Sequence, residues 1–265
     1  KSSYAMEEGA MGIGSSLIYA PGDYASTEEL IELCKVASNY GGMYISHMRN
    51  EDSKVMSALE ELIRISKEAD IPAEIYHLKS SRKPNWKKID DIIKRVEEVR
   101  GQGLKITADI YTYNASSTGL TGVIPTWVQE GGHKAWIERM KDPNIRPRLL
   151  EDIRKELSEQ PPEGILMVGF KTSEMSKKYL SKTVAEAAKM RGQSPEEAIV
   201  DMVIEDDNRI QCIYFSMSEE NIRKKIKLPW VSFCSDAGVY SDITKNFRTH
   251  PRAFGSFVRV LGKYS

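Results

Sequence analysis

The segment from Met43 to Lys79 reads MYISHMRNEDSKVMSALEELIRISKEADIPAEIYHLK. It opens with a short β-prone run that ends in Ser46-His47, and it closes with a second β-prone run that ends in His77. Between the two runs, apolar residues recur at the spacing of one helix face: Val55, Leu59, Leu62 and Ile63. The two histidines are separated by about one βα unit. The segment therefore predicts a strand, a helix and a second strand in a parallel sheet.

The same alternation extends over most of the chain. Further strands are expected at Leu104–Tyr111, Gln211–Ser216 and Val231–Ser235, with another near Met11–Leu17. Further helices are expected at Ser26–Tyr40, Trp86–Arg100, Thr183–Met190 and from Ser194 onward. Three of these helices begin with a capping-box pair: Ser26 with Glu29, Thr183 with Glu186 and Ser194 with Glu197. Such alternation predicts an α/β protein with a mostly parallel sheet covered by helices.

A barrel and an open doubly wound sheet both fit this alternation. Four predicted strands end in chemically capable groups: Ser46-His47, His77-Leu78-Lys79, Asp109-Ile110-Tyr111 and Ser235-Asp236. Groups at successive carboxyl ends converge on the top face of a (β/α)₈ barrel, whereas an open sheet gathers only those near its switch point. The pattern therefore favours a TIM-like barrel, and we expect residues 1–265 to form a single barrel domain.

The stretch from Thr112 to Lys182 interrupts the alternation of strands and helices. It is rich in proline and glycine, and we expect at most one or two short helices in it. An insertion of this length after a strand commonly covers a site. We expect residues 112–182 to form a lid over the barrel top, with aromatic residues such as Trp127 facing the pocket.

Composition excludes some classes of function. Lysine plus arginine and aspartate plus glutamate both number 38, so no net field attracts nucleic acid or an anionic membrane. No apolar run reaches the roughly 18 residues that a transmembrane helix needs. The three cysteines show no CxxC pairing, which favours a reducing compartment, and we expect a cytoplasmic protein.

Two strand-end histidines one βα unit apart, followed by a late strand-end aspartate, form a candidate metal site. Zinc requires neutral imidazoles held rigidly toward one point, which strand ends supply. We therefore expect His47, His77 and Asp236 to be ligands, although Asp236 fits a helix cap or turn equally well. The segment from Met48 to Glu51 is expected to shape the loop behind the first histidine, and Glu51 or Arg49 is expected to support the ligands. His133 is expected to be exposed, and His250 is expected to support the ligands or to be structural, and not to bind metal.

Several segments carry a family resemblance, in matching order and at compatible spacing. They are Ala20–Ala25 (APGDYA), Gly42–Glu51 (GMYISHMRNE), Tyr76–Lys79 (YHLK), Asp109–Tyr111 (DIY), Ser235-Asp236 and His250–Gly255 (HPRAFG). Together they resemble the N-acyl-D-amino-acid deacylases, or D-aminoacylases, of the amidohydrolase superfamily. The resemblance covers nearly the whole chain.

This resemblance implies a metal-dependent amidohydrolase with one or two Zn²⁺ ions. His47, His77 and Asp236 would bind metal, and Asp236 would be the catalytic acid and base. Lys79, Tyr111 and Arg252 would bind the α-carboxylate of a small N-acyl amino acid. The expected reaction is hydrolysis of the linear amide of an N-acyl-D-amino acid to a carboxylate and a D-amino acid.

The sequence departs from the family pattern in one respect. The family carries a His-x-His pair and a cysteine ligand on early strands, and no matching residues precede His47. We expect these ligands, and a small β-sandwich, to lie upstream of Lys1, which predicts a partial barrel. Two rival readings stay open. One is a cyclic-amide hydrolase of the dihydroorotase or hydantoinase kind, or a dipeptidase, and the other is a non-catalytic remnant.

Overall fold

The computed structural model describes residues 1–238 and 248–265, which divide into two compact units. The first unit contains residues 1–112, 218–236 and 256–265, and the second contains residues 113–217 and 237–255. The sequence predicts one domain with an insertion at 112–182, whereas the second unit runs on to Met217.

The first unit is built on a parallel sheet in the order β1-β2-β3-β4-β8. Every neighbouring pair of strands is parallel, so all five carboxyl ends lie at one edge. The strands are β1 (Gly12–Ser16), β2 (Met43–His47), β3 (Ala73–Ile75), β4 (Ile106–Ile110) and β8 (Val231–Phe233). These strands confirm the α/β class and the parallel sheet. The described residues form them as an open sheet.

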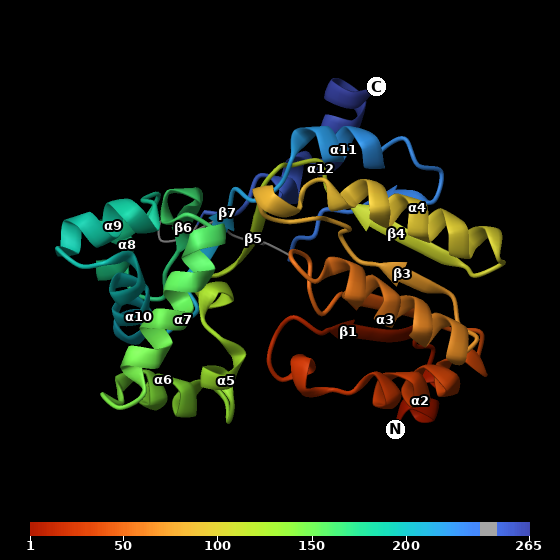
Figure 1. Ribbon diagram of the computed structural model, residues 1–265, viewed down its shortest axis with the longest axis horizontal. Coiled ribbons are helices and arrows are strands. Elements are labelled where there is room, and N and C mark those ends of the chain that lie inside the picture. The colour runs from red at the N-terminus through yellow and green to blue at the C-terminus, as the bar shows by residue number, and fades with distance from the viewer. Residues whose placement is uncertain (239–247) are drawn as a thin grey trace. The chain divides into compact units, whose positions relative to one another are not determined.

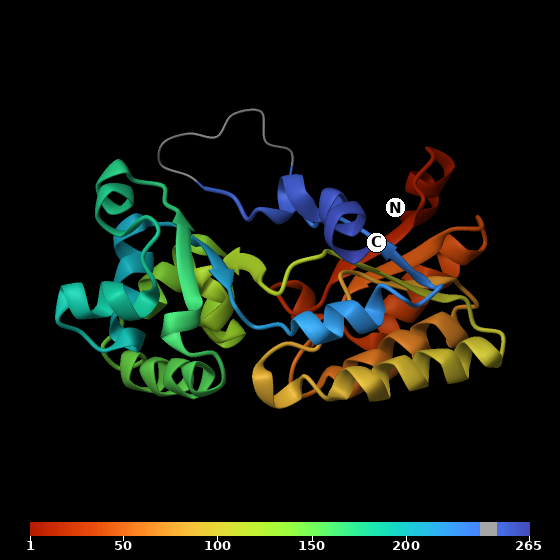
Figure 2. The ribbon, with the colours of Figure 1, turned by 90° about the horizontal axis from the view of Figure 1, so that it is seen from above.

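Helices follow the first three strands and pack on one face of the sheet (Figures 1 and 2). The side chains of β2 alternate accordingly: Tyr44 and Ser46 are buried toward the helices, while His47 is half-buried on the opposite face. The helices of this unit are α1 (Ser2–Glu7), α2 (Thr27–Ser38), α3 (Val55–Glu68), α4 (Lys88–Gly101) and α11 (Glu219–Lys225). Short helical turns lie at Gly22–Tyr24, Lys83–Asn85 and Val260–Tyr264.

The second unit is a three-stranded antiparallel sheet with helices around its own core. Its strands are β5 (Ser116–Gly119), β6 (Ile165–Gly169) and β7 (Gln211–Tyr214). Its helices are α5 (Thr126–Gln129), α6 (His133–Lys141), α7 (Arg146–Glu159), α8 (Ser173–Tyr179), α9 (Val184–Arg191) and α10 (Pro195–Asp206), with turns at Leu120–Val123 and Pro162–Gly164. Helix α12 (Arg252–Arg259) begins in this unit, and its residues from Ser256 onward belong to the first.

Two expectations about this region are wrong. The strand predicted at Gln211–Ser216 forms, but it pairs antiparallel with β5 and β6 and does not join the parallel sheet. The stretch 112–182 holds four helices, including the fourteen-residue α7, and not one or two short ones. Pro125, Pro147 and Pro162 lie at helix starts, where the missing N–H costs nothing, and Pro143 lies in the turn between α6 and α7, so these prolines do not interrupt helices.

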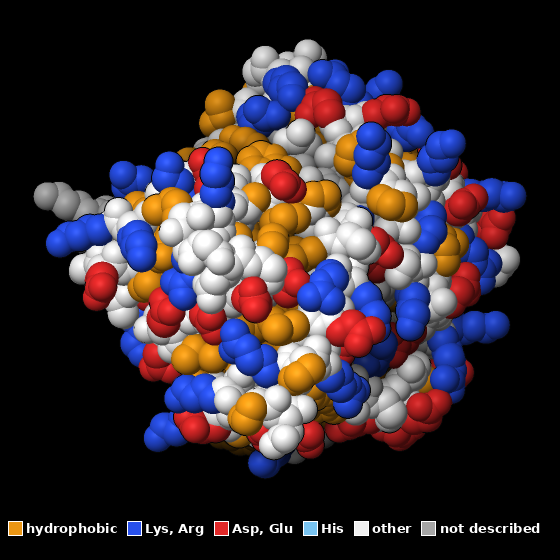
Figure 3. Space-filling model, turned by 60° about the vertical axis from the view of Figure 1, so that its left-hand side comes forward, with side chains coloured by type: hydrophobic (Ala, Val, Ile, Leu, Met, Phe, Trp, Pro, Cys, Tyr) orange, Lys and Arg blue, Asp and Glu red, His pale blue; other side chains and the backbone are white. Residues whose placement is uncertain are grey.

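The capping boxes predicted at the starts of the two helices α9 and α10 are confirmed. Thr183 with Glu186 and Ser194 with Glu197 form reciprocal capping boxes at the starts of α9 and α10. Ser26 caps α2 by accepting a hydrogen bond from the Glu29 amide. On the face shown in Figure 3, basic and acidic side chains are interspersed, in keeping with the zero net charge.

Candidate metal centre

The carboxyl-terminal edge of the parallel sheet brings the predicted site residues to one end. His47 is the last residue of β2, His77 follows β3 by two residues, and Asp236 follows β8 by three. His77 and Asp236 both adopt left-handed backbone angles, with φ of 42° and 46°. Non-glycine residues in this region are strained, and such strain is common at functional sites.

The turn that carries His77 is fixed by hydrogen bonds from several sides. The His77 amide donates to Asp109 Oδ1 at 2.6 Å, and the Leu78 amide donates to the Asp109 carbonyl at 2.8 Å. The Leu78 carbonyl accepts from Lys225 Nζ at 2.5 Å. Both Asp109 and Lys225 are buried, so this backbone is held away from solvent. The turn therefore presents the His77 ring in a defined direction.

The two imidazoles converge on one carboxylate. The rings of His47 and His77 meet edge to face, with centroids 4.3 Å apart. Their Nδ1 atoms lie 3.7 Å and 3.1 Å from Glu51 Oε1. One ligand atom from each of these three residues lies within 4.8 Å of the other two. His47 Nδ1 is buried and has no hydrogen-bond partner among the residues that the structure describes. A buried unpaired nitrogen facing a carboxylate is costly unless a cation is bound there.

The protonation states of these residues suit metal binding. Burial lowers the pKa of His47 to about 4, although Glu51 opposes the shift, so the imidazole is neutral at pH 7. Burial alone would raise the pKa of Glu51, but His47, Lys79 and His77 beside it hold that pKa well below its usual range. Neutral imidazole and ionised carboxylate are the forms that coordinate a metal.

Lys79 enters the same cluster. Its ammonium donates to Glu51 Oε1 at 2.8 Å and to His77 Nδ1 at 2.6 Å. The lysine is buried, with 3% of its surface exposed. Its Nζ lies 5.8 Å from the centroid of the Tyr111 ring. The structure therefore brings together His47, His77 and Lys79, and places Tyr111 next to the lysine.

Asp236 reaches this cluster through Tyr76. The Tyr76 ring packs against His77 with centroids 4.1 Å apart, and its hydroxyl donates to Asp236 Oδ1 at 2.8 Å. Burial first, and then the Asp236 carboxylate, raise the pKa of Tyr76. Asp236 is not among the three residues whose ligand atoms cluster within 4.8 Å. Its carboxylate is thus linked to the histidines by one phenol.

The remaining predicted residues lie in the second unit. Arg252 Nη2 donates to the Ser117 carbonyl at 3.4 Å. His250 is buried between the Ala115 carbonyl, at 3.0 Å from Nε2, and the Arg252 amide, at 2.9 Å from Nδ1, which gives it a structural environment. His133 is exposed and pairs with Asp207 at 2.8 Å. Trp127 donates to Asp152 and lies under Arg148, both on α7 of the same unit.

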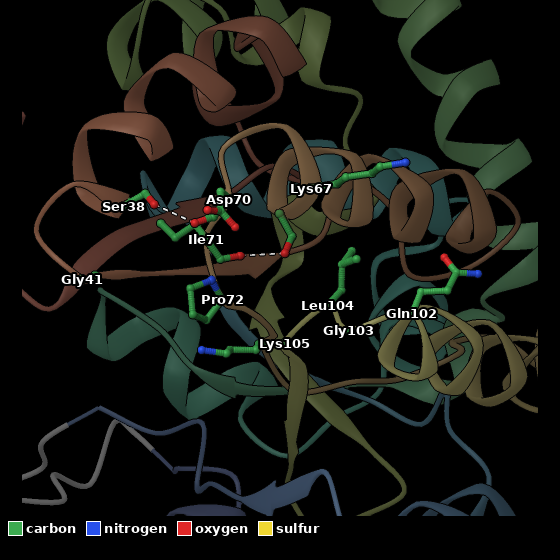
Figure 4. A pocket seen from close by; sticks show the side chains of 12 residues that line it. Ser38, Gly41, Lys67, Asp70, Ile71, Pro72, Gln102, Gly103, Leu104 and Lys105 are labelled. Atoms are coloured by element: carbon green, nitrogen blue, oxygen red, sulfur yellow. Dashed lines mark hydrogen bonds between the residues drawn. The ribbon is translucent and has the colours of Figure 1, made fainter.

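A hollow of about 440 Å³ borders the histidine cluster and is lined by Gly14, Ser15, Ser16, Ile45, His47 and Tyr76. A larger hollow of about 610 Å³ lies at the opposite, amino-terminal end of the strands (Figure 4). There the Ser38 and Ser66 hydroxyls donate to the backbone carbonyls of Asp70 and Ile71, which ties the loops together. The chemically capable groups therefore border the smaller hollow.

Three residues have roles that the sequence alone did not assign. Glu51 was expected only to support the ligands, yet its carboxylate is the point on which both histidines converge. Its position four residues after His47 was a usable signal. Tyr76 and Lys225 carried no signal, because their partners lie 160 and 147 residues away. Arg49, the other residue expected to support the ligands, instead binds Glu61 and two backbone carbonyls.

Comparison with known proteins confirms the resemblance. No family model matches the chain. It is 29% identical over 261 residues to a D-aminoacylase, and 28% identical over 260 residues to an N-acyl-D-glutamate deacylase, both from Alcaligenes xylosoxydans xylosoxydans. Each match covers 98% of this chain and 44% of the relative. The chain therefore spans less than half the length of the curated relatives it matches.

Solved structures that are similar to this chain belong to the same kinds of deacylase as these relatives. The N-acyl-D-glutamate deacylase of Bordetella bronchiseptica, solved with zinc and a phosphonate mimic of the tetrahedral intermediate, superposes with a TM-score of 0.75 at 26% identity. That match covers 99% of this chain and 46% of the neighbour. A D-aminoacylase that defines a subset of amidohydrolases gives 0.72 at 28% identity, covering 99% and 45%. D-Aminoacylase has also been described with a binuclear metal centre. In the described part of this chain, no helix has the length and apolar character that crossing a membrane requires.

Proposed function

We propose that this chain carries the metal centre of a zinc-dependent enzyme that hydrolyses the linear amide of N-acyl-D-amino acids. The observation that carries the proposal is the convergence of His47 Nδ1 and His77 Nδ1 on Glu51 at the carboxyl edge of a parallel sheet. Similarity over 98% of the chain to a D-aminoacylase and an N-acyl-D-glutamate deacylase supports the substrate class.

His47 and His77 would hold zinc, with Glu51 as a third donor from the described residues. The fit rests on the buried Nδ1 of His47, which has no hydrogen-bond partner within residues 1–238 and 248–265, and on the depressed pKa values of His47 and Glu51. Nitrogen and carboxylate oxygen are the ligands that catalytic zinc sites use. When bound, zinc polarises the scissile carbonyl and lowers the pKa of its water from 15.7 toward about 7. One or two ions would be bound.

Asp236 would be the catalytic acid and base. Its carboxylate would accept a proton from the attacking water and later deliver that proton to the leaving amine. The hydrogen bond from Tyr76 fixes one oxygen of Asp236, Oδ1, and the Asp236 backbone adopts a left-handed φ of 46°. Asp236 would also approach the metal as a ligand.

Lys79, Tyr111 and Arg252 would recognise the substrate α-carboxylate. The Lys79 ammonium lies over the Tyr111 ring, 5.8 Å from its centroid, so a carboxylate bound there could accept from both a cation and a phenol. The small hollow beside His47 would receive the remainder of the N-acyl amino acid. The partner is thus a small molecule.

The five parallel strands would be part of a (β/α)₈ barrel, and residues 112–182 would cover its top. Support comes from the shared direction of all five strands and from TM-scores of 0.72 and 0.75 to deacylases that are more than twice as long. The face of the sheet opposite helices α2, α3 and α4, which carries His47, would then face the barrel interior.

Metal analysis of the purified full-length gene product and of three variants of it tests the proposal. We expect about one or two zinc per chain in the unmodified protein, and loss of zinc and deacylase activity together in His77→Ala, because a site with few ligands cannot spare one. Asp236→Asn should keep zinc but lose turnover, since an amide cannot carry the proton. His133→Ala, which removes an exposed histidine of the second unit, is the control and should change neither. Absence of zinc from the unmodified protein, or normal turnover in Asp236→Asn, would contradict the proposal.

A further inference from the structure

The buried face of helix α11 carries two polar side chains where a packed helix is usually apolar. Asn221 and Lys225 are four residues apart and therefore lie on the same face of the helix. Both are buried, with 7% and 4% of their surface exposed. Burying an amide or an ammonium costs free energy unless its protons meet acceptors. Both side chains donate to backbone carbonyls of the loop between β3 and α4.

The two acceptors lie near opposite ends of that loop. Lys225 Nζ donates to the Leu78 carbonyl at 2.5 Å, and Asn221 Nδ2 donates to the Trp86 carbonyl at 2.9 Å. Between β3 and α4 the only regular element is the short helical turn Lys83–Asn85. The shape of the loop therefore depends on contacts with neighbouring segments, and α11 holds it at both ends.

The same loop carries two residues of the candidate site, His77 and Lys79. The His77 backbone has a φ of 42°, a sparsely populated conformation that persists only when the surrounding structure holds it. The His77 amide donates to Asp109 Oδ1 at 2.6 Å, and the Ser81 amide donates to the Glu51 carbonyl at 2.7 Å. The loop is thus held by β4, by the segment after β2 and by α11.

We propose that Asn221 and Lys225 are positioning residues, which hold the loop that carries His77 in the conformation that binds metal. The inference rests on the proposed metal site. A metal bound through His77 gains affinity when the loop is ordered beforehand, because binding then does not bear the entropy cost of ordering it. The same helix leads into β8, after which Asp236 follows. One helix would therefore support both the proposed ligand and the proposed acid and base.

Zinc affinity of two variants of the full-length gene product tests this role. Lys225→Met and Asn221→Ala each remove one donor to the loop. We expect the zinc Kd, measured by chelator competition without any activity assay, to rise about tenfold in Lys225→Met, the lower end of what the loss of a group that orients a metal ligand costs. Asn221→Ala acts at the end of the loop farther from His77 and should raise Kd by a smaller factor. It also decides the question if Lys225→Met does not fold.

Val99→Ala is the control that separates positioning from general stability. Val99 is buried in the last turn of α4, at the end of that helix away from the loop. Urea unfolding should show this variant to be less stable than the unmodified protein, because a buried side chain is truncated. Its zinc Kd should nevertheless stay unchanged.

The outcomes distinguish this inference from the proposed function. An unchanged zinc Kd in both Lys225→Met and Asn221→Ala would overturn the positioning role and leave the metal site standing. An equal rise of Kd in Val99→Ala would also overturn it, because metal affinity would then follow overall stability. If the unmodified protein binds no zinc, the proposed function fails, and the positioning role fails with it.

Discussion

Lys225 is a fully buried lysine behind the His77 turn, and replacing it should change how stability depends on pH. Its Nζ donates to the Leu78 carbonyl. Burial first, and then the nearby Lys79, lower the pKa of Lys225 from 10.5 to about 7, although Glu51 and Cys234 oppose the shift. The folded protein therefore holds this proton less tightly than the unfolded chain does.

The sign and size of this pH dependence follow from the linkage between proton binding and folding. Between pH 7 and 10.5 the unfolded state binds a proton at Lys225 that the folded state does not, so the free energy of unfolding rises with pH across this window. Below pH 7 Lys225 is protonated in both the folded and the unfolded state, so the full free-energy cost of burying its charge remains. A shift of 3.5 pKa units corresponds to about 5 kcal/mol, and about 3 kcal/mol of it is recovered between about pH 6.5 and pH 9.5.

Lys225→Met removes this titration and also removes the donor to Leu78, a loss that costs about 1–3 kcal/mol at every pH. We expect unfolding free energies from urea denaturation, taken as unmodified protein minus variant, to rise by about 3 kcal/mol over that pH range. Lys224→Met is the control, because the neighbouring Lys224 pairs with Asp90, which raises its pKa, and this difference should stay flat. A flat difference for Lys225→Met as well would refute the reasoning.

Two further predictions concern the sheet and Asp236, the carboxylate proposed as acid and base. Gly12→Ala would place a Cβ 1.9 Å from the Met43 carbonyl oxygen and push β1 away from β2. We expect this clash to lower the unfolding free energy by more than about 3 kcal/mol. Gly14→Ala in the same strand is the control and should be tolerated, because its Cβ would meet nothing closer than 3.6 Å. Equal stability of the two variants would contradict the strand register. Tyr76→Phe should lower turnover about tenfold with zinc content unchanged, because Asp236 loses a charge-assisted hydrogen bond. Unchanged turnover would show that this bond does not position the carboxylate.

The sequence by itself determined the features that depend on neighbours along the chain. Strand and helix periods predicted the parallel sheet, and β2 has the predicted limits of Met43 and His47. The pairs Thr183 with Glu186 and Ser194 with Glu197 predicted two helix starts, because a capping box is complete within four residues. Parallel strands expose their carboxyl ends at one edge, so His47 and His77 could be expected to meet.

Only the tertiary structure decided the features that depend on distant partners. The strand at Gln211–Tyr214 was visible locally, yet its antiparallel pairing with β5 and β6 required segments some 45 and 95 residues away. Lys225 and Tyr76 act on residues far along the chain, so no local pattern marked them. The fourth residue after His47 became the centre of the cluster because the fold buries Glu51 against both imidazoles and the Lys79 ammonium. Burial and the approach of distant charges set the pKa values that give these groups their chemistry, and a linear sequence contains neither quantity.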